Sequence, residues 1–305
     1  MTTSFSDVFC ETPDGLKLHA KTLGGGKTST LPVLCLPGLT RTADGGVELD
    51  GDGEIVEYLL EMRRFDQNGV LATQPWAIDD ALEDSLGRTV ARFHGGATLR
   101  PQGGGVSALG YTIRSNANLL RGLAPRLGKQ AVERLVHETD IALERLGPLL
   151  DARAADGFAR HCHGDLHLGN ILIENGQPIL FDCIEFNDTL SDIDIQYDLA
   201  FLLMDLDFRR RRDAAGRVLN AYLDEAARSF GEGLWTGLAA LPLMLSVRAA
   251  VRTHVWAYTG DDEAARRNAR WIALWTTLIT FAVSVILVLQ ARQRRQGSDA
   301  GKGMV

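Results

Sequence analysis

The sequence predicts an α+β protein with a β-rich beginning, a largely helical body and a hydrophobic helix near its C-terminal end. Short alternating or apolar runs, separated by turn residues, fill the first 62 residues. Apolar residues at three- and four-residue steps dominate from about residue 76 to 256, and residues 271–291 carry no charge. Alternation is typical of strands and the longer step is typical of helices.

Composition limits the classes of function. The chain has 305 residues, 45% of them hydrophobic and 23% charged, which is typical of a folded protein. Its net charge of -7 argues against a nucleic-acid partner, because binding to a phosphate backbone relies on excess Lys and Arg. The four cysteines are scattered without a CxxC, so we expect no disulfide framework and a reducing compartment.

Turn residues divide the first region into short strands. Strands are predicted over residues 8–10, 16–22, 31–36 and 54–62. Thr12-Pro13-Asp14-Gly15 is a turn signal between the first two, and the apolar third strand suits a buried position. Residues 43–53 are rich in Gly and Asp and indicate a loop or hairpin.

Helical spacing begins near residue 76. Ile78, Leu82, Leu86, Val90 and Phe93 recur at helical steps, and a second helix is expected over 130–151 beyond a Gly-rich separator at 95–110. Later helices are predicted over 193–207, 212–230 and 234–256. Between the two groups, residues 171–183 indicate a β-hairpin that turns at Glu174-Asn175-Gly176-Gln177.

The uncharged block 271–291 is long enough to cross a bilayer, whose hydrocarbon core is ~30 Å thick. A membrane span is the favoured interpretation, and a buried helix of the globular body is the alternative. Arginines flank the block on both sides, so the positive-inside rule does not orient it. The run 234–247 has only 14 residues without a charge, and a core helix is predicted there.

The strongest motif is HGDLHLGN at residues 163–170, followed by the hairpin and Phe181-Asp182. Phosphoryl transfer from ATP needs positioning, charge neutralisation by Mg²⁺ and a carboxylate near the acceptor hydroxyl. Asp165 is the candidate catalytic carboxylate, and Asn170 and Asp182 are candidate Mg²⁺ ligands. The spacing H-x-D-x4-N matches the kinase catalytic loop, with Gly164 where protein kinases usually have arginine.

The same stretch allows two alternatives to a kinase loop. It could be a structural loop with incidental polar residues. It could also hold zinc, because His161, Cys162, His163 and His167 lie close together in the sequence. Zinc would need four convergent ligands, whereas the kinase interpretation uses His163 as a loop-packing residue.

Residues 44–258 resemble the aminoglycoside phosphotransferase family, within the protein-kinase-like fold. The matching stretches are GEIVEYLLEMRRFD (53–66), ARFHGGA (91–97), HCHGDLHLGNILI (161–173), PILFDCIEFND (178–188), DIQYDLAFLLMDL (194–206) and SVRAAVRTHV (246–255). The resemblance implies a hinge near residue 62, a C-lobe over 66–258, ATP and Mg²⁺ as cofactors, and transfer to a hydroxyl of a small molecule.

The resemblance also implies roles for individual residues. Asp165 becomes the catalytic base, and Asn170 and Asp182 become the metal ligands. Glu61 and Met62 fall at the hinge, where main-chain groups hold adenine. His163 and Asp198 support the catalytic loop, although Asp198 could equally be a helix N-terminal charge. Past Asp182, the acidic residues Glu185, Asp188, Asp192 and Asp194 could attract a cationic acceptor, with Glu185 as the candidate contact, or form a solvated acidic face.

The region before the hinge departs from the kinase pattern. A kinase N-lobe carries a Gly-rich loop and a strand lysine paired with a helix glutamate, and only Lys17, Lys21 and Lys27 are candidates for that lysine. Residues 4–40 instead resemble the start of an α/β-hydrolase, although the chain has no GxSxG; Gly105-Val-Ser107-Ala-Leu-Gly110 has the wrong spacing. We therefore expect an atypical or incomplete N-lobe that impairs turnover.

The end of the chain carries a third resemblance. Residues 260–288 resemble a membrane segment of the antiporter-like subunit of NADH:quinone oxidoreductase, which implies an anchor. The chain thus divides into 1–43, 44–258 and 259–305, and together these indicate a chimeric sequence. We expect a cytoplasmic catalytic domain anchored to the inner or cytoplasmic membrane. The alternatives are a membrane-tethered pseudokinase or nucleotide-binding module without turnover, and a hydrolase remnant.

Overall fold

The structure, a computed structural model, describes residues 5–11, 17–23, 34–49, 51–61 and 66–261, together with Ala264, Ala265 and Arg267. It consists of two compact units, Met1–Asp66 and Gln67–Val305. The segment boundaries predicted from the sequence stay predictions.

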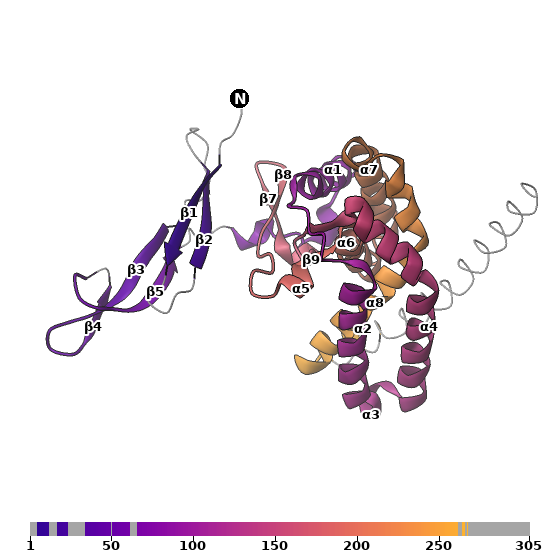
Figure 1. The fold of residues 1–305 in the computed structure, drawn as a ribbon, viewed down its shortest axis with the longest axis horizontal. Helices are drawn as coiled ribbons and strands as arrows, with labels where there is room; N and C mark the ends of the chain where they lie inside the picture. Colours follow the sequence, from indigo (N-terminus) through magenta and orange to yellow (C-terminus); the bar gives the residue numbers. More distant parts are fainter. Residues whose placement is uncertain are drawn as a thin grey trace, which may run out of the picture. The chain divides into compact units, whose positions relative to one another are not determined.

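The described elements of the first unit are strands (Figure 1). They are β1 (Phe5–Glu11), β2 (Lys17–Leu23), β3 (Leu34–Arg41), β4 (Val47–Leu49) and β5 (Ile55–Glu61). β1 pairs antiparallel with β2, and β3 lies between β4 and β5 in a second antiparallel sheet. The strands on both sides of the predicted turn are thereby confirmed, as are the hairpin within 43–53 and the strand at 54–62.

The third strand runs further than its apolar run predicts. β3 continues through Pro37 and Gly38, and its register with β5 shifts between Leu36 and Leu39. Proline has no N–H to donate to a ladder, and glycine tolerates the backbone of a bulge. The Pro-Gly pair therefore ends the apolar run without ending the strand.

The second unit is mostly helical. Its α-helices are α1 (Asp80–Gly96), α2 (Gly105–Gly122), α3 (Ala124–Leu127), α4 (Lys129–Arg153), α5 (Asp188–Ser191), α6 (Ile195–Phe208), α7 (Arg212–Phe230) and α8 (Leu241–Tyr258). Its strands are β6 (Ala159–His161), β7 (Ile171–Glu174), β8 (Gln177–Leu180) and β9 (Asp192–Asp194). β7 and β8 form the predicted hairpin, and α7 has the predicted bounds.

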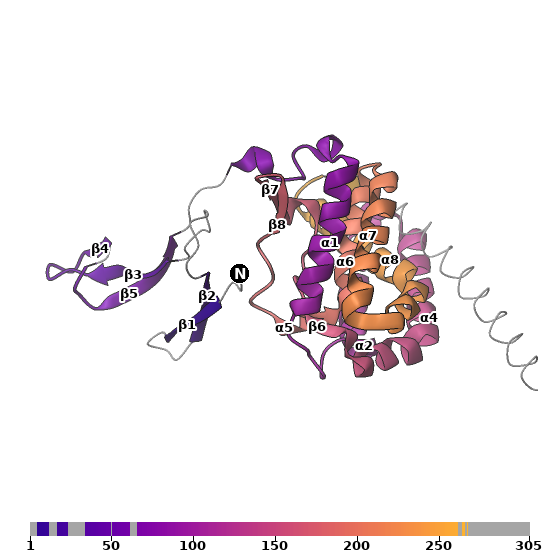
Figure 2. The same ribbon diagram turned by 90° about the horizontal axis from the view of Figure 1, so that it is seen from above.

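Helix α1 begins directly after an N-cap residue, Asp79. The Asp79 side chain accepts a hydrogen bond from Leu82 N at 2.8 Å, and the periodic residues Leu86 and Val90 are fully buried. α1 packs against α7 (Figure 2). The approach is close at Gly87, where an added Cβ would lie 2.5 Å from Val218 O, so only glycine fits this helix crossing.

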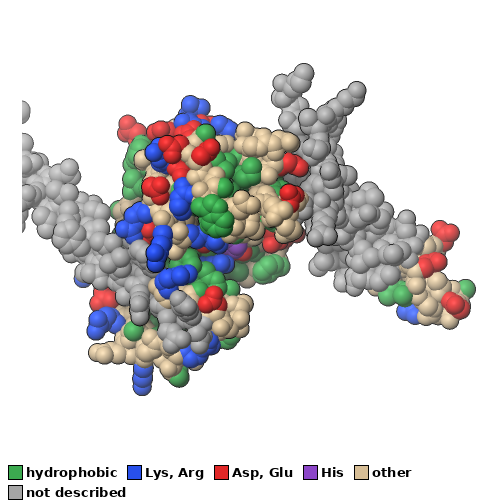
Figure 3. All heavy atoms as spheres, turned by 180° about the vertical axis from the view of Figure 1, so that it is seen from behind, with side chains coloured by type: hydrophobic (Ala, Val, Ile, Leu, Met, Phe, Trp, Pro, Cys, Tyr) green, Lys and Arg blue, Asp and Glu red, His purple; other side chains and the backbone are tan. Residues whose placement is uncertain are grey.

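Charges on the surface also join these two helices. Arg88 and Arg92 of α1 contact Glu225 of α7 at 3.3 and 3.1 Å. Acidic and basic side chains both lie on the face of the second unit that Figure 3 shows. Exposed pairs of this kind contribute about 0–1 kcal/mol each, so the α1–α7 pair depends mainly on its apolar contact.

The start of α2 differs from the prediction. The sequence predicts only a separator between helices over 95–110, yet α2 begins at Gly105. Gly104 and Gly105 both have positive φ, at 69° and 64°, and the Asp151 side chain accepts a hydrogen bond from Val106 N at 2.9 Å. The missing cap thus comes from α4. Ser107 lies exposed in the first turn of a helix, which is not the setting of a hydrolase nucleophile.

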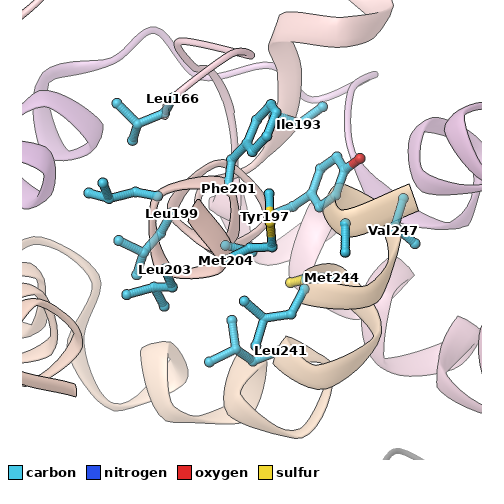
Figure 4. Packing of buried hydrophobic residues seen from close by; sticks show 14 of the residues in the cluster. Leu166, Ile193, Tyr197, Leu199, Phe201, Leu203, Met204, Leu241, Met244 and Val247 are labelled. Atoms are coloured by element: carbon cyan, nitrogen blue, oxygen red, sulfur yellow. The ribbon is translucent and has the colours of Figure 1, made fainter. Parts of the chain in front are cut away.

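Helix α6 is the centre of the core. Every residue from Ile195 to Asp207 is buried, because the helix is covered on all sides (Figure 4). The predicted core run 234–247 is only partly buried: Leu234 and Leu243 are fully enclosed, but Trp235 is 48% exposed, and the run is not one continuous helix. A 3₁₀ helix, η5 (Gly231–Ala239), precedes α8, which has a proline in its first turn.

Among the described residues, no single helix is both long and apolar enough to cross a membrane. One pair, Arg212–Ala239 with Leu241–Tyr258, passes on length and composition together but is bent by 74°. The α8 part of this pair belongs to the buried core. The predicted span 271–291 lies outside the described residues.

Candidate active site

The HGDLHLGN loop connects β6 to β7 and is held by its own apolar residues. Leu166 and Leu168 are fully buried, and their neighbours Asp165 and His167 are only partly buried. A 3₁₀ turn, η4 (Leu168–Asn170), leads directly into β7. Alternation of buried leucines with polar residues therefore leaves Asp165 accessible on an otherwise fixed loop.

Asp165 and Asn170 lie side by side. Asn170 Nδ2 donates to the Asp165 backbone oxygen at 2.9 Å and to Asp165 Oδ2 at 3.1 Å. His167 Nε2 is 3.4 Å from the same carboxylate oxygen. Burial alone would raise the pKa of Asp165, but the hydrogen bond and charge of His167, the charge of Arg248 and the Asn170 amide together lower it. The Asp165 carboxylate is therefore ionised at neutral pH.

The structure also brings Asp182 to this loop. Phe181 N donates to Asn170 O at 3.1 Å, and His163 Nε2 donates to Phe181 O at 2.8 Å. Asp182 follows at once with a φ of 59°, a left-handed conformation that Asp tolerates better than most residues. Its side chain is exposed and has no hydrogen bond or ion pair with the described residues. Asn170 and Asp182 thus belong to one hydrogen-bonded junction.

Glycine at position 164 has a structural cause. Gly164 has a φ of 81°, and an added Cβ would lie 3.0 Å from Leu190 O and 3.1 Å from Ile184. The arginine that protein kinases usually carry here would be strained by this φ and crowded by these neighbours. An arginine reaches this point from α8 instead, because Arg248 donates to Gly164 O at 2.9 Å.

Asp198 lies beneath the loop, fully buried on α6. Its Oδ2 accepts from His163 N at 3.1 Å and its Oδ1 from Gly164 N at 2.9 Å. Asp198 also lies in the first turn of α6. It therefore contacts the loop and is at the same time an acidic residue at a helix N-terminus. The backbone amides of His163 and Gly164, the two residues before Asp165, thus both donate to the Asp198 carboxylate.

The acidic residues past Asp182 do not form one face. Asp192 contacts Arg100 at 2.9 Å and His161 at 2.7 Å, and Asp194 is buried against Arg153. Glu185 and Asp188 are exposed. A continuous acidic face is therefore wrong for the second half of the run, and the contact of Glu185 with the acceptor stays a prediction.

The zinc alternative does not survive the geometry. His161 faces Asp192, Cys162 Sγ donates to Ile193 O at 3.5 Å, and His163 bonds Phe181 O. His167 Nδ1 accepts from Gly169 N at 3.0 Å. The four side chains therefore do not converge on one another. Among the described residues, Cys162 groups instead with His94 and Asp198, and His161 with Asp188 and Asp192.

The predicted hinge residues lie at and just beyond the end of β5. Glu61 is the last residue of β5, and its side chain is not described; Met62 lies outside the described residues. Lys17 and Lys21 lie on β2, while Lys27 is outside the described residues. Their roles at a hinge or a phosphate site stay predictions.

Three buried residues that support this part of the unit were missed by sequence reasoning. His94, Arg153 and Arg248 are all buried and bond elements far away in the chain. Two of them lie within stretches that resemble the family, ARFHGGA and SVRAAVRTHV, which was the only available signal. Long-range pairing of a single His or Arg cannot be read from one sequence.

Arg153 and Asp194 form a buried bidentate pair. Arg153 Nε is 2.7 Å from Asp194 Oδ2 and its Nη2 is 3.1 Å from Oδ1. We expect Arg153→Met to lower the free energy of unfolding by about 3–5 kcal/mol, because it leaves a buried carboxylate without its partner. Urea unfolding measures this. A loss under about 1 kcal/mol would contradict it, and Asp194→Asn added to Arg153→Met should recover part of the loss.

Comparison with known proteins identifies the family of the chain. Residues 49–238 match the model of the phosphotransferase enzyme family. The strands of the first unit and the largely helical second unit give the α+β fold that the sequence predicts. The chain belongs to the phosphotransferase enzyme family.

Individual relatives add little about activity. Uncharacterized proteins of Mycobacterium tuberculosis (strain H37Rv) and Mycobacterium bovis are 31% identical over 238 residues, which is 74% of this chain and 46% of theirs. The chain thus spans about half the length of the curated relatives it matches. A solved glucosamine kinase, in complex with glucosamine, ADP and inorganic phosphate, is 16% identical with a TM-score of 0.47, covering 74% of this chain and 62% of that one.

Proposed function

We propose that the protein transfers the γ-phosphoryl group of ATP to a hydroxyl of a small molecule, with Mg²⁺ as the metal. The observation that carries this proposal is the junction of Asp165, Asn170 and Asp182. Phosphoryl transfer asks a protein mainly for a positioned carboxylate and for ligands to the metal. The loop and the β7–β8 hairpin supply both within one unit of the chain.

The donor atoms suit Mg²⁺. Both Asn170 amide hydrogen bonds run from Nδ2 to Asp165, which leaves Oδ1 as the atom available to a metal. Asp182 adds an exposed carboxylate with no partner among the described residues. Oxygen ligands of this kind are those that Mg²⁺ prefers. A metal held by Asn170 and Asp182 would supply positive charge that neutralises the phosphates during transfer.

The chain's own residues would do the rest. Asp165, ionised at neutral pH, would accept the proton of the acceptor hydroxyl through its free carboxylate oxygen, while His167 and Asn170 hold the other. The main chain near Glu61 and Met62 would hold the adenine, and Glu185 would contact the acceptor.

We further propose that turnover is low and that residues 271–291 anchor a cytoplasmic domain to the membrane. Kinases typically turn over at about 1–100 s⁻¹, and we expect a rate below that range. The support is the sequence before the hinge, which lacks the Gly-rich loop of a kinase N-lobe. Robust turnover would overturn this part and leave the site intact.

The experiment is ADP release by the purified full chain across a panel of sugars, amino sugars, aminoglycosides and simple alcohols. We expect release to require Mg²⁺ and to stop with EDTA. Asp182→Asn should lower kcat on the order of 100-fold at low Mg²⁺, because one electrostatic contact to the transferring group weakens. Added Mg²⁺ should restore part of the rate, and Asp224→Asn, an exposed carboxylate on α7, is the control.

Two results would reject the proposal. If ADP release were as fast with EDTA as with Mg²⁺, the metal assignment would be wrong. If the chain bound ATP with Mg²⁺ but released no ADP with any acceptor, the nucleotide-binding module without turnover would replace the enzyme.

A further inference from the structure

We infer that His94 of α1 is a positioning residue for the catalytic loop and acts through Asp198. The inference rests on the proposed function for its kinetic test, and it has a second test that does not. His94 lies 104 residues before Asp198 in the chain, and its Nε2 is 3.0 Å from Asp198 Oδ2. Both side chains are fully buried.

The carboxylate of Asp198 is shared between α1 and the loop. Oδ2 receives His94 Nε2 and the His163 amide, and Oδ1 receives the Gly164 amide. An ionised carboxylate only accepts hydrogen bonds, so Nε2 of His94 must carry a hydrogen. The His94 donor therefore fixes the rotation of the carboxylate that in turn fixes two loop amides.

The other side of the His94 ring is fixed as well. Nδ1 is 3.0 Å from Tyr222 OH on α7, and the two rings meet edge to face. A phenol can either donate or accept, so this contact holds the ring in either charge state. Burial raises the pKa of the Tyr222 phenol well above its usual value, which keeps the hydroxyl neutral.

This chain of contacts ends at the reacting groups. Gly164 immediately precedes Asp165, and the His163 ring donates to Phe181 O, next to Asp182. A shift of Asp198 would therefore move both the candidate base and a candidate metal ligand. Misplacement of reacting groups by about 1 Å can cost on the order of 100-fold in rate.

Packing alone would not require histidine at this position. Val90 lies one turn earlier on α1, is equally buried and has no polar contact. A Phe at position 94 would fill similar space but would leave Asp198 Oδ2 without one of its donors. The hydrogen bond to Asp198 therefore explains why a histidine occupies position 94.

The kinetic test compares three variants of the full chain. We expect His94→Phe to lower kcat about 10- to 100-fold with the KM for MgATP changed less than twofold. His94→Gln, whose amide can still donate to Asp198, should recover most of the loss. Val90→Ala should lose stability but keep kcat within twofold. A matching loss of kcat in Val90→Ala, or no recovery in His94→Gln, would overturn the inference.

The second test needs no turnover. The chain contains only two His-Gly pairs, His94-Gly95 and His163-Gly164. Labelling His with ¹³C at the carbonyl and Gly with ¹⁵N therefore gives two selectable amide signals, and His94→Phe removes one of them. We expect the remaining Gly164 signal to shift in His94→Phe and to stay in place in Val90→Ala. An unmoved Gly164 signal in His94→Phe would overturn the inference even if the enzyme proved inactive.

Discussion

Asp165→Asn should reduce phosphoryl transfer by about 100- to 10,000-fold, the range that general-base groups contribute. The asparagine has nearly the same shape and can keep the contacts to Asn170 and His167, but it cannot accept the hydroxyl proton. The expected loss is therefore in kcat, with ATP affinity nearly unchanged. Initial rates of ADP release measure it.

The matched control is Asp224→Asn, which removes one negative charge from an exposed position on α7. It should leave kcat within twofold. If Asp165→Asn and Asp224→Asn had the same rate, Asp165 would not be the base. A decline in both would point to overall charge instead of a positioned carboxylate.

Asp198→Ala should lower the free energy of unfolding by about 3–5 kcal/mol. The change leaves the amides of His163 and Gly164 without their acceptor and Arg248 without a nearby negative charge, 3.7 Å away in the structure. Buried donors left unpaired cost about 1–3 kcal/mol each, and breaking a buried charge pair is strongly destabilising. Urea unfolding of the full chain is the measurement, and a loss below about 1 kcal/mol would contradict the role.

The pH dependence of stability follows from the same residue. Burial alone would raise the pKa of Asp198, but the hydrogen bond and charge of His94 and the charges of Arg248 and His163 outweigh burial and lower it. A carboxyl with a lowered folded pKa contributes stability above its unfolded pKa of about 3.9, and this is lost as pH falls through the folded value. Wild type should therefore lose stability more steeply than Asp198→Ala below about pH 4. Parallel curves would contradict this.

Local pattern explains why much of the fold was predictable. Helix α1 has an Asp79 cap and regular apolar steps, and the β7–β8 hairpin has an Asn-Gly turn, so each carries its own signal within a short window. The extension of β3 and the start of α2 lacked such a signal. The first depends on pairing with β5 across a bulge, and the second on a cap donated by Asp151 from α4.

The candidate site likewise has a part that local sequence predicts and a part that only the fold brings together. The spacing of Asp165, Asn170 and Asp182 is local, and the structure brings these three residues to one junction. The supports are not local, because His94 and Arg248 come from α1 and α8 and meet the loop only in the folded chain. In the acidic run, by contrast, residues that are close in the sequence have different partners in the fold: Asp192 pairs with Arg100 and Asp194 with Arg153.

The most direct test of phosphoryl transfer uses ATP labelled with ¹⁸O on the γ-phosphoryl group. The full chain is incubated with Mg²⁺ and the acceptor panel, and the masses of the products are measured by mass spectrometry. We expect a phosphorylated alcohol that carries the label, formed slowly by wild type and reduced at least about 100-fold with Asp165→Asn. Labelled product at equal rates from wild type and Asp165→Asn, or ATP binding with no labelled product from any acceptor, would contradict phosphoryl transfer at this site.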